Sequence, residues 1–364
     1  MEKKGHIKKL LPGGNTSVGF YSYFKYVINP KEARKIYYFK GGPGVGKSHM
    51  MKKIGYEMVD RGFDVEFHHC SAEPSSVDVV VIPKLKVVLL DGTSPHADDP
   101  TYPGVVGSTV NLGEFINEEA IRKHRESVIR ATDENKNIYI RVYKYLSTAK
   151  LIHDDIEWIN GYAMDFSKVN KETNILIERY LKDIENKDRL GSERHLFGSA
   201  YTLNGKLDFA ETFIGIIDDI IYIKGADGTG KSTLLKKLAD IALMKGYDVE
   251  IYHEPLVPEK IESIIIPELG LAFTTNIKFA EKQTVDLDIY IDREKISKYK
   301  EELEYSEKLF KQLLNDVFAN LSKTNAVHDE IEKYYVPNVS HAGTDQVGDR
   351  ILGEILGIIE EINI

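Results

Sequence analysis

Two segments of the chain combine glycines, a lysine and a serine in a pattern that binds nucleotide phosphates. Gly41–Ser48 reads GGPGVGKS and Gly225–Ser232 reads GADGTGKS. Both fit the order Gly, any four residues, then Gly-Lys-Ser. In such loops the backbone N–H groups turn toward phosphate oxygens, the lysine contacts the β- and γ-phosphates, and the hydroxyl joins the Mg²⁺ shell. We therefore expect two sites for ATP and Mg²⁺.

The expected nucleotide contacts follow from the two patterns. In the first loop they are Gly41, Gly42, Gly44, Val45, Gly46, Lys47, Ser48 and His49. In the second loop they are Gly225, Asp227, Gly228, Thr229, Gly230, Lys231, Ser232 and Thr233. The expected metal contacts are Ser48, Asp91 and Ser232.

Asp91 ends the apolar run Val87–Leu90, as expected for a strand whose terminal carboxylate holds Mg²⁺. The second copy has Thr275 at the equivalent position. We expect the second site to hold metal poorly unless Glu254 or Asp286 substitutes for the missing carboxylate.

The first copy also carries about nine more residues after this strand, within 92–104. Besides Lys47 and Asp91, we expect Thr93 and His96 in this loop to be catalytic, orienting a water or a substrate hydroxyl. The alternative is a turn-rich surface loop that uses Asp and Pro for backbone reasons.

Both loops have the flanks that their chemistry needs. Ile36–Phe39 and Ile220–Ile223 are β-prone apolar runs, and helical apolar spacing follows each loop. A shift of 184 residues aligns Lys47 with Lys231, and a shift of 175 aligns the segments 153–157 and 328–332, which read HDDIE and HDEIE. A repeat of this length indicates a duplicated domain.

The expected fold is α/β, with two tandem phosphate-loop NTPase domains at 1–190 and 191–364. We expect mostly parallel sheets with flanking helices, and a helical extension in each copy. The segments 77–82 and 86–90 are too close for a parallel crossover, so they predict an antiparallel element. Asn117 and Asp292 are expected helix N-caps.

Composition narrows the class of protein. The formal charge of −9 argues against general nucleic-acid binding. One cysteine permits no internal disulfide and fits a reducing cytoplasm. No apolar run approaches the roughly 18 residues of a membrane span. Two domains on one chain have a high effective concentration, so we expect the copies to pack as an intramolecular pseudo-dimer.

Other candidate groups favour ordinary roles. The first copy carries Arg122, Arg125, Arg130 and Arg141 on its expected helices, where a solvated face is the better interpretation than a γ-phosphate contact. Neighbouring residues of a strand face opposite ways, which argues against a metal site at His68-His69-Cys70. We interpret His153 and His328 as structural.

The two loops, the segment Asp91–His96 and the repeated His-Asp-acid-Ile-Glu resemble a family of uncharacterised tandem P-loop ATPases of Gram-positive bacteria. Its members are described as ATP-binding or similar to nucleotide kinases. The resemblance covers nearly the whole chain and implies the fold and the ligand, without a substrate.

Three functions therefore stand as hypotheses. The first is a Mg²⁺-dependent ATPase that works in the first copy, with a second copy that binds nucleotide or regulates. The others are a kinase for a small nucleoside-like molecule and an ATP-controlled interaction protein. We expect ATP rather than GTP, because the segment Asn186–Asp188 lacks the second Asp of a guanine-reading motif. The small-molecule or protein partner is open.

Overall fold

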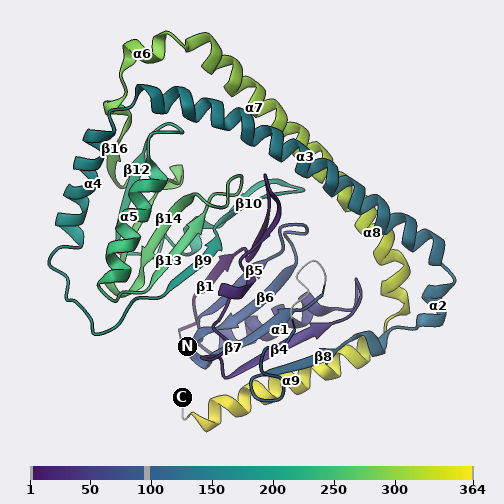
Figure 1. Ribbon diagram of the computed structural model, residues 1–364. Coiled ribbons are helices and arrows are strands. Elements are labelled where there is room, and N and C mark those ends of the chain that lie inside the picture. Colours follow the sequence, from purple (N-terminus) through teal and green to yellow (C-terminus); the bar gives the residue numbers. More distant parts are fainter. Residues whose placement is uncertain (1–2, 94–98, 363–364) are drawn as a thin grey trace.

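The apolar runs before the two glycine-rich loops form buried strands, β4 (Lys35–Lys40) and β12 (Asp219–Lys224), of two separate sheets. The computed structural model describes residues 3–93 and 99–362. It shows an α/β chain in which each sheet has six strands and is flanked by helices (Figure 1). Two hairpins, β2–β3 (Gly13–Thr16, Gly19–Ser22) and β10–β11 (Ser199–Thr202, Gly205–Asp208), accompany the sheets.

The two sheets have the same strand order, so the duplication extends to topology. In space the first sheet runs β1 (Ile7–Leu10), β5 (Val65–His69), β6 (Val77–Ile82), β7 (Val87–Asp91), β4 and β8 (Gly107–Asn111). The second runs β9 (Glu193–Phe197), β13 (Val249–His253), β14 (Ile261–Ile266), β15 (Leu271–Thr274), β12 and β16 (Gln283–Asp286). Within each sheet only β6 or β14 opposes the other strands, which confirms the predicted antiparallel element.

The helices also correspond between the copies. The first copy has α1 (Lys47–Asp60), α2 (Glu118–Arg122), α3 (Arg125–Ala163) and α4 (Phe166–Tyr180). The second has α5 (Lys231–Met244), α6 (Arg293–Ser297), α7 (Lys300–Leu321), α8 (Lys323–Tyr335) and α9 (His341–Glu361). Asn117 and Asp292 cap α2 and α6 by accepting backbone N–H groups, as predicted.

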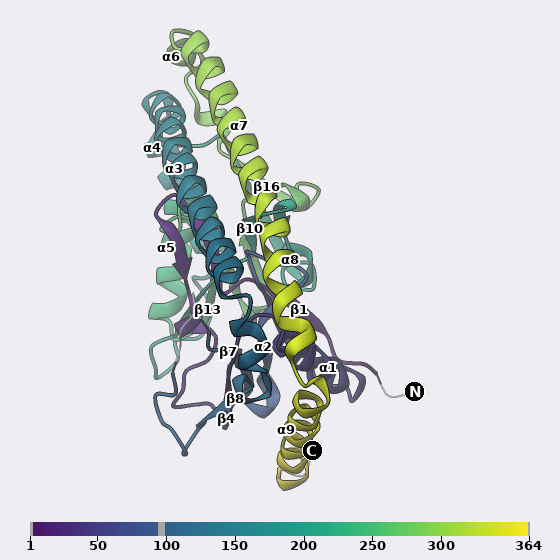
Figure 2. The ribbon, with the colours of Figure 1, turned by 90° about the vertical axis from the view of Figure 1, so that its right-hand side faces the viewer.

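Long helices cross between the copies. The 39 residues of α3 span about 58 Å at 1.5 Å per residue. This helix lies against α7 and α8 (Figure 2), and their seam buries Val142, Leu146, Val317 and Leu321. The seam therefore joins one long helix of the first copy to the corresponding helices of the second.

Beyond these crossing helices, the two copies exchange their closing helices. α4, from the first half of the sequence, packs on α5 and buries Val169 and Leu176 in the core of the second sheet. α9, from the second half, packs on α1 and buries Ile351 and Ile355 in the core of the first sheet. The division at residue 190 marks the repeat in sequence, whereas each packed core contains a helix from the other half.

Reciprocal contacts join the two sheets at their edges, where Lys8 of β1 pairs with Glu250 of β13 and Arg194 of β9 pairs with Glu66 of β5. Lys8 Nζ donates to Glu250 Oε2 at 2.7 Å, and Arg194 Nη2 donates to Glu66 Oε2 at 2.6 Å. Backbone hydrogen bonds between Leu11 and Phe197 run in both directions at 3.1 Å. The reciprocity is that of a two-fold interface within one chain.

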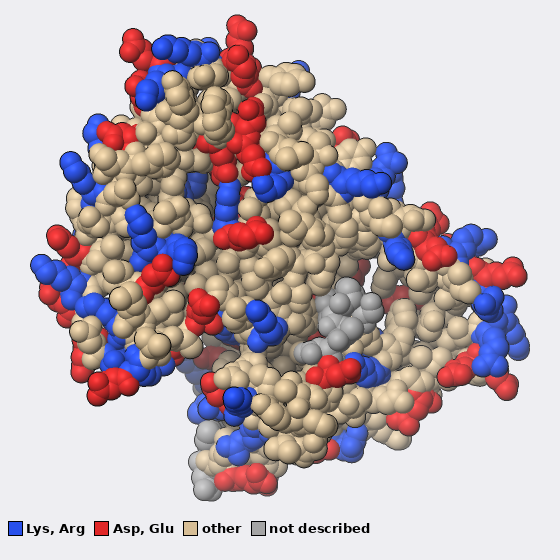
Figure 3. Space-filling model, in the orientation of Figure 1, with Lys and Arg blue, Asp and Glu red and all other residues tan. Residues whose placement is uncertain are grey.

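The surface carries mixed charge. On the face drawn in Figure 3, basic and acidic side chains are interspersed. Within residues 3–93 and 99–362, no helix is both long enough and apolar enough to cross a membrane.

The buried charges predict a pH-dependent stability. Burial favours a neutral Glu66, but Arg194 and Lys8 outweigh it and hold the pKa of Glu66 well below its ordinary value of 4.5. Arg194→Met should therefore lower the free energy of unfolding by about 3–5 kcal/mol at pH 7, because a carboxylate stays buried without its main partner. The pairing stabilises the folded state above pH 4.5 and is lost as the pH falls toward the folded pKa of Glu66, so the loss in the variant should shrink in acid.

Urea unfolding at pH 7 and pH 4 measures this effect. Arg189→Met, which removes an exposed pair with Asp248, is the control and should change the midpoint little. The double variant Arg194→Met with Glu66→Gln should regain part of the loss. A double variant less stable than Arg194→Met alone would contradict the argument.

The exchange of helices gives a second prediction. Ile351→Ala removes a fully buried side chain and should destabilise the chain by about 2–5 kcal/mol. The increase in amide hydrogen exchange should appear in α1, in the other half of the sequence. Leu176→Ala, the equivalent change, should expose α5 instead. If faster amide hydrogen exchange stayed within the mutated half of the sequence in each variant, the swap of α4 and α9 between the copies would be excluded.

Candidate functional site

The first glycine-rich loop lies between β4 and α1 and beneath a helix of the second copy. Gly44 has a φ of 67°, and a Cβ there would lie 2.7 Å from Val336 Cγ2. Gly42 is similarly covered by Tyr335. The close approach of the end of α8 therefore requires glycine at two of the four positions that the phosphate pattern leaves open.

Lys47 and Asp91 meet at this loop as the sequence predicted. Lys47 Nζ donates to the carbonyl oxygens of Gly41 and Gly42 at 2.9 and 3.0 Å and lies 3.6 Å from Asp91 Oδ2. Ser48 begins α1 alongside Lys47, and its Oγ accepts the N–H of Val77 at 3.0 Å. An ammonium, a hydroxyl and a carboxylate thus share one pocket.

The predicted catalytic loop is described only in part. Thr93 donates to Asp91 Oδ1 through its N–H at 2.9 Å and its hydroxyl at 2.6 Å. Thr93 therefore orients Asp91 through both groups. His96 lies outside the described residues.

The pocket around the first loop has a volume of about 640 Å³ and contains groups that the sequence analysis did not select. Asp78 and Cys70 also line this pocket, and both come from the β5–β6 region. Burial, followed by Asp78, raises the pKa of Cys70 well above its ordinary value. A signal for Asp78 was available, because the shift of 184 aligns it with Glu262 and both copies therefore hold an acid there.

Of the predicted first-loop contacts, Gly44, Val45, Gly46, Lys47, Ser48 and His49 line this pocket. The side chain of Val45 is buried in the core beneath it, so only its backbone can serve a phosphate. Gly41 and Gly42 hold Lys47 through their carbonyl groups.

The second loop repeats the geometry of the first. Lys231 Nζ donates to the carbonyl oxygens of Gly225 and Ala226 at 2.6 and 2.8 Å. Ser232 Oγ accepts the N–H of Ile261 at 2.9 Å, the counterpart of the Ser48 contact. The hydroxyl of Thr229 closes the loop on the carbonyl of Ala226 at 2.7 Å.

The pocket around the second loop has a volume of about 510 Å³. The predicted contacts that line it are Gly225, Asp227, Gly228, Gly230, Lys231, Ser232 and Thr233. Its walls also carry Glu254 and Lys260, which the shift of 184 aligns with Cys70 and Ser76 of the first pocket.

Thr275 takes the place of Asp91 in this pocket, and its N–H donates to the carbonyl of Glu262 at 2.9 Å. Of the two candidate substitutes for the missing acid, Glu254 lines the pocket, whereas Asp286 pairs with Lys224 at 2.6 Å and is not among the lining residues. Glu262 lines it as well. Burial raises the pKa of Glu254, and it raises the pKa of Glu262 to about 6.

Helix α3 of the first copy covers the second loop. His153 Nε2 lies 3.4 Å from Asp227 Oδ2, and Asn160 Nδ2 donates to the carbonyl of Asp227 at 2.9 Å. Glu157 forms an ion pair with Lys260. A Cβ on Gly228 would lie 2.2 Å from the carbonyl oxygen of Glu157, and the φ of this glycine is 87°.

The first pocket is completed in the same way, because α8 contributes His328, Asp329 and Glu332 to its wall. The repeated segments 153–157 and 328–332 therefore each lie at the loop of the other copy. The sequence alone favours a structural role for both histidines. Their repetition was visible in the sequence, but nothing local indicated that each would cross to the other loop.

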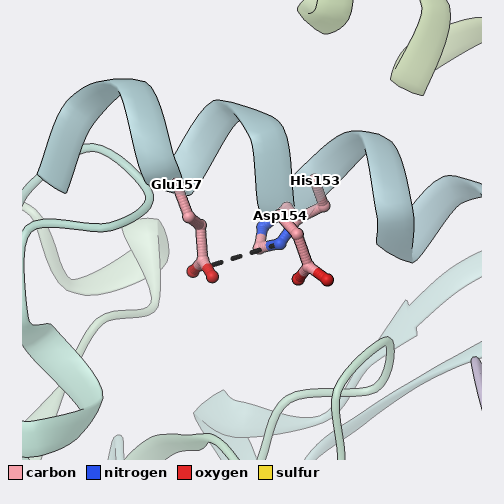
Figure 4. Close-up of side chains that lie close together, drawn as sticks. All are labelled: His153, Asp154 and Glu157. Carbon is pink, nitrogen blue, oxygen red and sulfur yellow. Dashed lines mark ion pairs between the residues drawn. The ribbon is translucent and has the colours of Figure 1, made fainter. Parts of the chain in front are cut away.

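Figure 4 shows His153, Asp154 and Glu157 on one face of α3. Their ligand atoms lie within 4.8 Å of one another, as a metal site would require. However, Asp154 pairs with Lys150 at 2.5 Å, and Glu157 pairs with Lys260. Both carboxylates are therefore already paired with lysines, which favours an ion-pair network over a metal site.

The remaining candidates have other partners. Arg122, Arg130 and Arg141 contact Glu118, Glu330 and Tyr145, and these arginines are not among the residues that line either loop pocket. Arg125 lies with Arg130 on the outer face of α3. The ring of His68 is fully buried and contacts Glu66 at 3.0 Å, whereas His69 contacts the carbonyl of Pro74.

Comparison with known proteins gives no further guide. No family model, no curated protein and no solved structure matches the chain.

The contact between His153 and Asp227 predicts a pH dependence above neutrality. Burial opposes protonation of His153, but Asp227, Glu254 and Glu157 outweigh it and raise its pKa above the ordinary value of 6.5. Pairing with His153 lowers the pKa of Asp227 to about 2. The protonated histidine therefore stabilises the folded state fully below pH 6.5, and this stability is lost as the pH rises through the folded pKa of His153.

His153→Gln should accordingly cost more stability at pH 6 than at pH 9, as measured by urea unfolding. His328→Gln, at the equivalent position with a side chain 42% exposed, is the control and should show a smaller change. Equal losses at both pH values would argue that the charge of His153 is unimportant.

Proposed function

We propose that the chain is a Mg²⁺-dependent P-loop NTPase that hydrolyses ATP mainly at the first loop. The observation that carries the proposal is the approach of Lys47 Nζ to within 3.6 Å of Asp91 Oδ2, beside Ser48. In phosphate-loop enzymes these groups hold the β- and γ-phosphates and the metal. The strand order, with β7 parallel to and beside β4, supports a P-loop fold because it brings the carboxylate to the edge where the loop begins.

The donor set around the first loop fits Mg²⁺. The Ser48 hydroxyl and the Asp91 carboxylate are the hard oxygen ligands that this ion prefers. Thr93 engages Oδ1 of Asp91, which leaves Oδ2 turned toward Lys47. Bound Mg²⁺ would neutralise charge on the transferring phosphoryl group.

The roles of the protein groups follow from their positions. Lys47 would exchange its contacts with the carbonyls of Gly41 and Gly42 for contacts with phosphate oxygens. The N–H groups of the loop and the N-terminus of α1 would bind the same oxygens. Asp91 would orient the metal-bound water, and Thr93 would hold Asp91 in place. Hydrolysis also needs a positioned water, for which Glu332 of α8 lies in the same pocket.

For the second loop we propose nucleotide binding with little turnover. It keeps Lys231 and Ser232 but has Thr275 in place of the acid. Glu254 and Glu262 provide carboxylates nearby, although burial raises the pKa of both and so weakens their charge. Because α3 of the first copy covers this loop, nucleotide bound there could regulate the first copy through that helix.

A kinase for a small polar acceptor is the second candidate. It is favoured by the extent of the first pocket, which continues past the loop along Glu73, Ser75, Ser76 and Asp78. Such a wall could bind a hydroxyl-bearing acceptor. Measurement of both ADP formation and free phosphate, with and without a panel of nucleosides and nucleotides, separates the two. A kinase would form ADP and a phosphorylated acceptor without free phosphate and only when its acceptor is present, whereas an ATPase would release phosphate without an acceptor.

The asymmetry gives a direct test. Asp91→Asn should lower steady-state phosphate release under saturating Mg-ATP by about 10–100-fold, since it removes the anionic group that supports the metal. Both loops should still bind nucleotide. Lys231→Ala should change the rate only indirectly, through affinity or coupling between the copies.

Thr275→Ala is the matched control, because it changes the equivalent position of the second copy, and it should leave the rate nearly unchanged. If Asp91→Asn kept the wild-type rate while Lys231→Ala was inactive, the working site would be in the second copy. Absence of ATP binding and turnover in the wild-type protein would reject the proposed function as a whole.

A further inference from the structure

Phe166 is an exposed aromatic residue at the mouth of the second loop. It begins α4, the helix that the first copy places on the second sheet, and 45% of its surface is exposed. Its ring lies against the loop backbone, since a Cβ on Gly230 would lie 3.4 Å from Phe166 Cε1. A large apolar side chain therefore borders the pocket in which phosphates are expected.

A second cavity, of about 500 Å³, lies on the other side of Phe166. Phe166 is common to the walls of this cavity and of the loop pocket. Met164, Ile289, Tyr290 and Ile291 also line this cavity; Met164 is buried in the core of the second sheet, whereas Ile289 is 70% exposed. The backbone bridge between Met164 and Ile291 holds the two sides of this lining together.

The acids at the rim of this cavity already have partners. Asp165 accepts the N–H groups of Ser167 and Lys168 as the cap of α4, and Asp292 caps α6 in the same way. Lys295 lies over the ring of Tyr162 at 5.3 Å. Most of the exposed lining of this cavity is polar, which suits the polar edge of a flat heterocycle, and Phe166 supplies the exposed ring on which such a heterocycle could stack.

We propose that this cavity binds the heterocyclic base of the nucleotide whose phosphates occupy the second loop, with the base stacked on Phe166. The inference rests on the proposed nucleotide binding and adds where the base lies and which half of the chain binds it. Phosphates would contact the second copy through Lys231 and Ser232. The base would contact segment 163–168 of the first copy, so a single nucleotide would bind both exchanged parts.

The first copy offers a matched comparison. The shift of 175 places His341 at the position of Phe166, and its ring contacts the carbonyl of Val336 at 3.1 Å. At this equivalent position the second site thus has a phenyl ring and the first copy an imidazole. Stacking on Phe166 should strengthen the binding of a nucleotide through its base and leave the binding of an inorganic phosphate chain unchanged.

The experiment uses the full chain with Lys47→Ala, so that titrations report on the second loop. Calorimetry compares Mg-ATP with inorganic tripolyphosphate in this parent and in three further variants, Phe166→Ala, Phe166→Tyr and His341→Ala. Phe166→Ala should weaken ATP binding by about tenfold, a typical loss for one stacked base. Tripolyphosphate binding should change less than about twofold, and Phe166→Tyr and His341→Ala should both retain ATP affinity.

Other outcomes would overturn the proposal in distinct ways. Equal weakening of both ligands by Phe166→Ala would mean that the ring only supports the loop. Unchanged ATP affinity in that variant, or a parent that binds ATP no more tightly than tripolyphosphate, would place the base elsewhere while leaving phosphate binding intact. A parent that binds neither ligand would reject the base subsite together with nucleotide binding at the second loop.

Discussion

Burial of the apolar faces of α4 and α9 is the interaction on which the rest of the structure depends. Leu176 and Ile351 occupy equivalent positions in the repeat, and each fills the core of the opposite copy. The rigid length of α3 imposes this arrangement, because an uninterrupted helix delivers its following residues far from the sheet that precedes it. Without the exchanged helices, α1 and α5 would each expose an apolar face to water.

The same geometry links packing to chemistry. The long helices that lead to α4 and α9 also pass over the loop of the other copy, so Glu157 of α3 pairs with Lys260, and Glu332 of α8 lines the pocket that holds Lys47. A ligand that moved either loop would press on a helix that belongs to the opposite copy. Because α3 lies against α7 and α8, such a displacement has a continuous packed route between the two pockets.

Much of this arrangement could be predicted from the sequence, for identifiable reasons. Phosphate loops have a strict spacing, so Lys47, Ser48 and their counterparts could be placed with their flanking strand and helix. Asp91 could be placed because an apolar strand leads directly to it. The antiparallel element followed from a connection too short for a crossover, and the equal strand order of the two sheets is what the fixed sequence shift implied.

The rest depends on contacts that local patterns do not encode. Periodicity shows that α4 and α9 are amphipathic but gives the same signal whichever sheet they cover. The partners of His153 therefore could not be found, although its repetition was plain. Asp78 was overlooked because it is the second residue of β6 and so lies near the start of a strand and not at its end. Glu66 and Arg194 carry no sequence signal for pairing, since they are 128 residues apart.

The position of α9 in the chain has a consequence for biosynthesis. The ribosome makes α1 early, but the helix that covers it follows roughly 280 residues later. At about 5–20 residues per second, the first sheet would wait tens of seconds with an uncovered apolar face. The second sheet, whose covering helix α4 is made before it, has no such delay. A nascent chain would therefore complete the core of its second sheet first, and translation interrupted before α8 would yield a protein whose first loop was never enclosed.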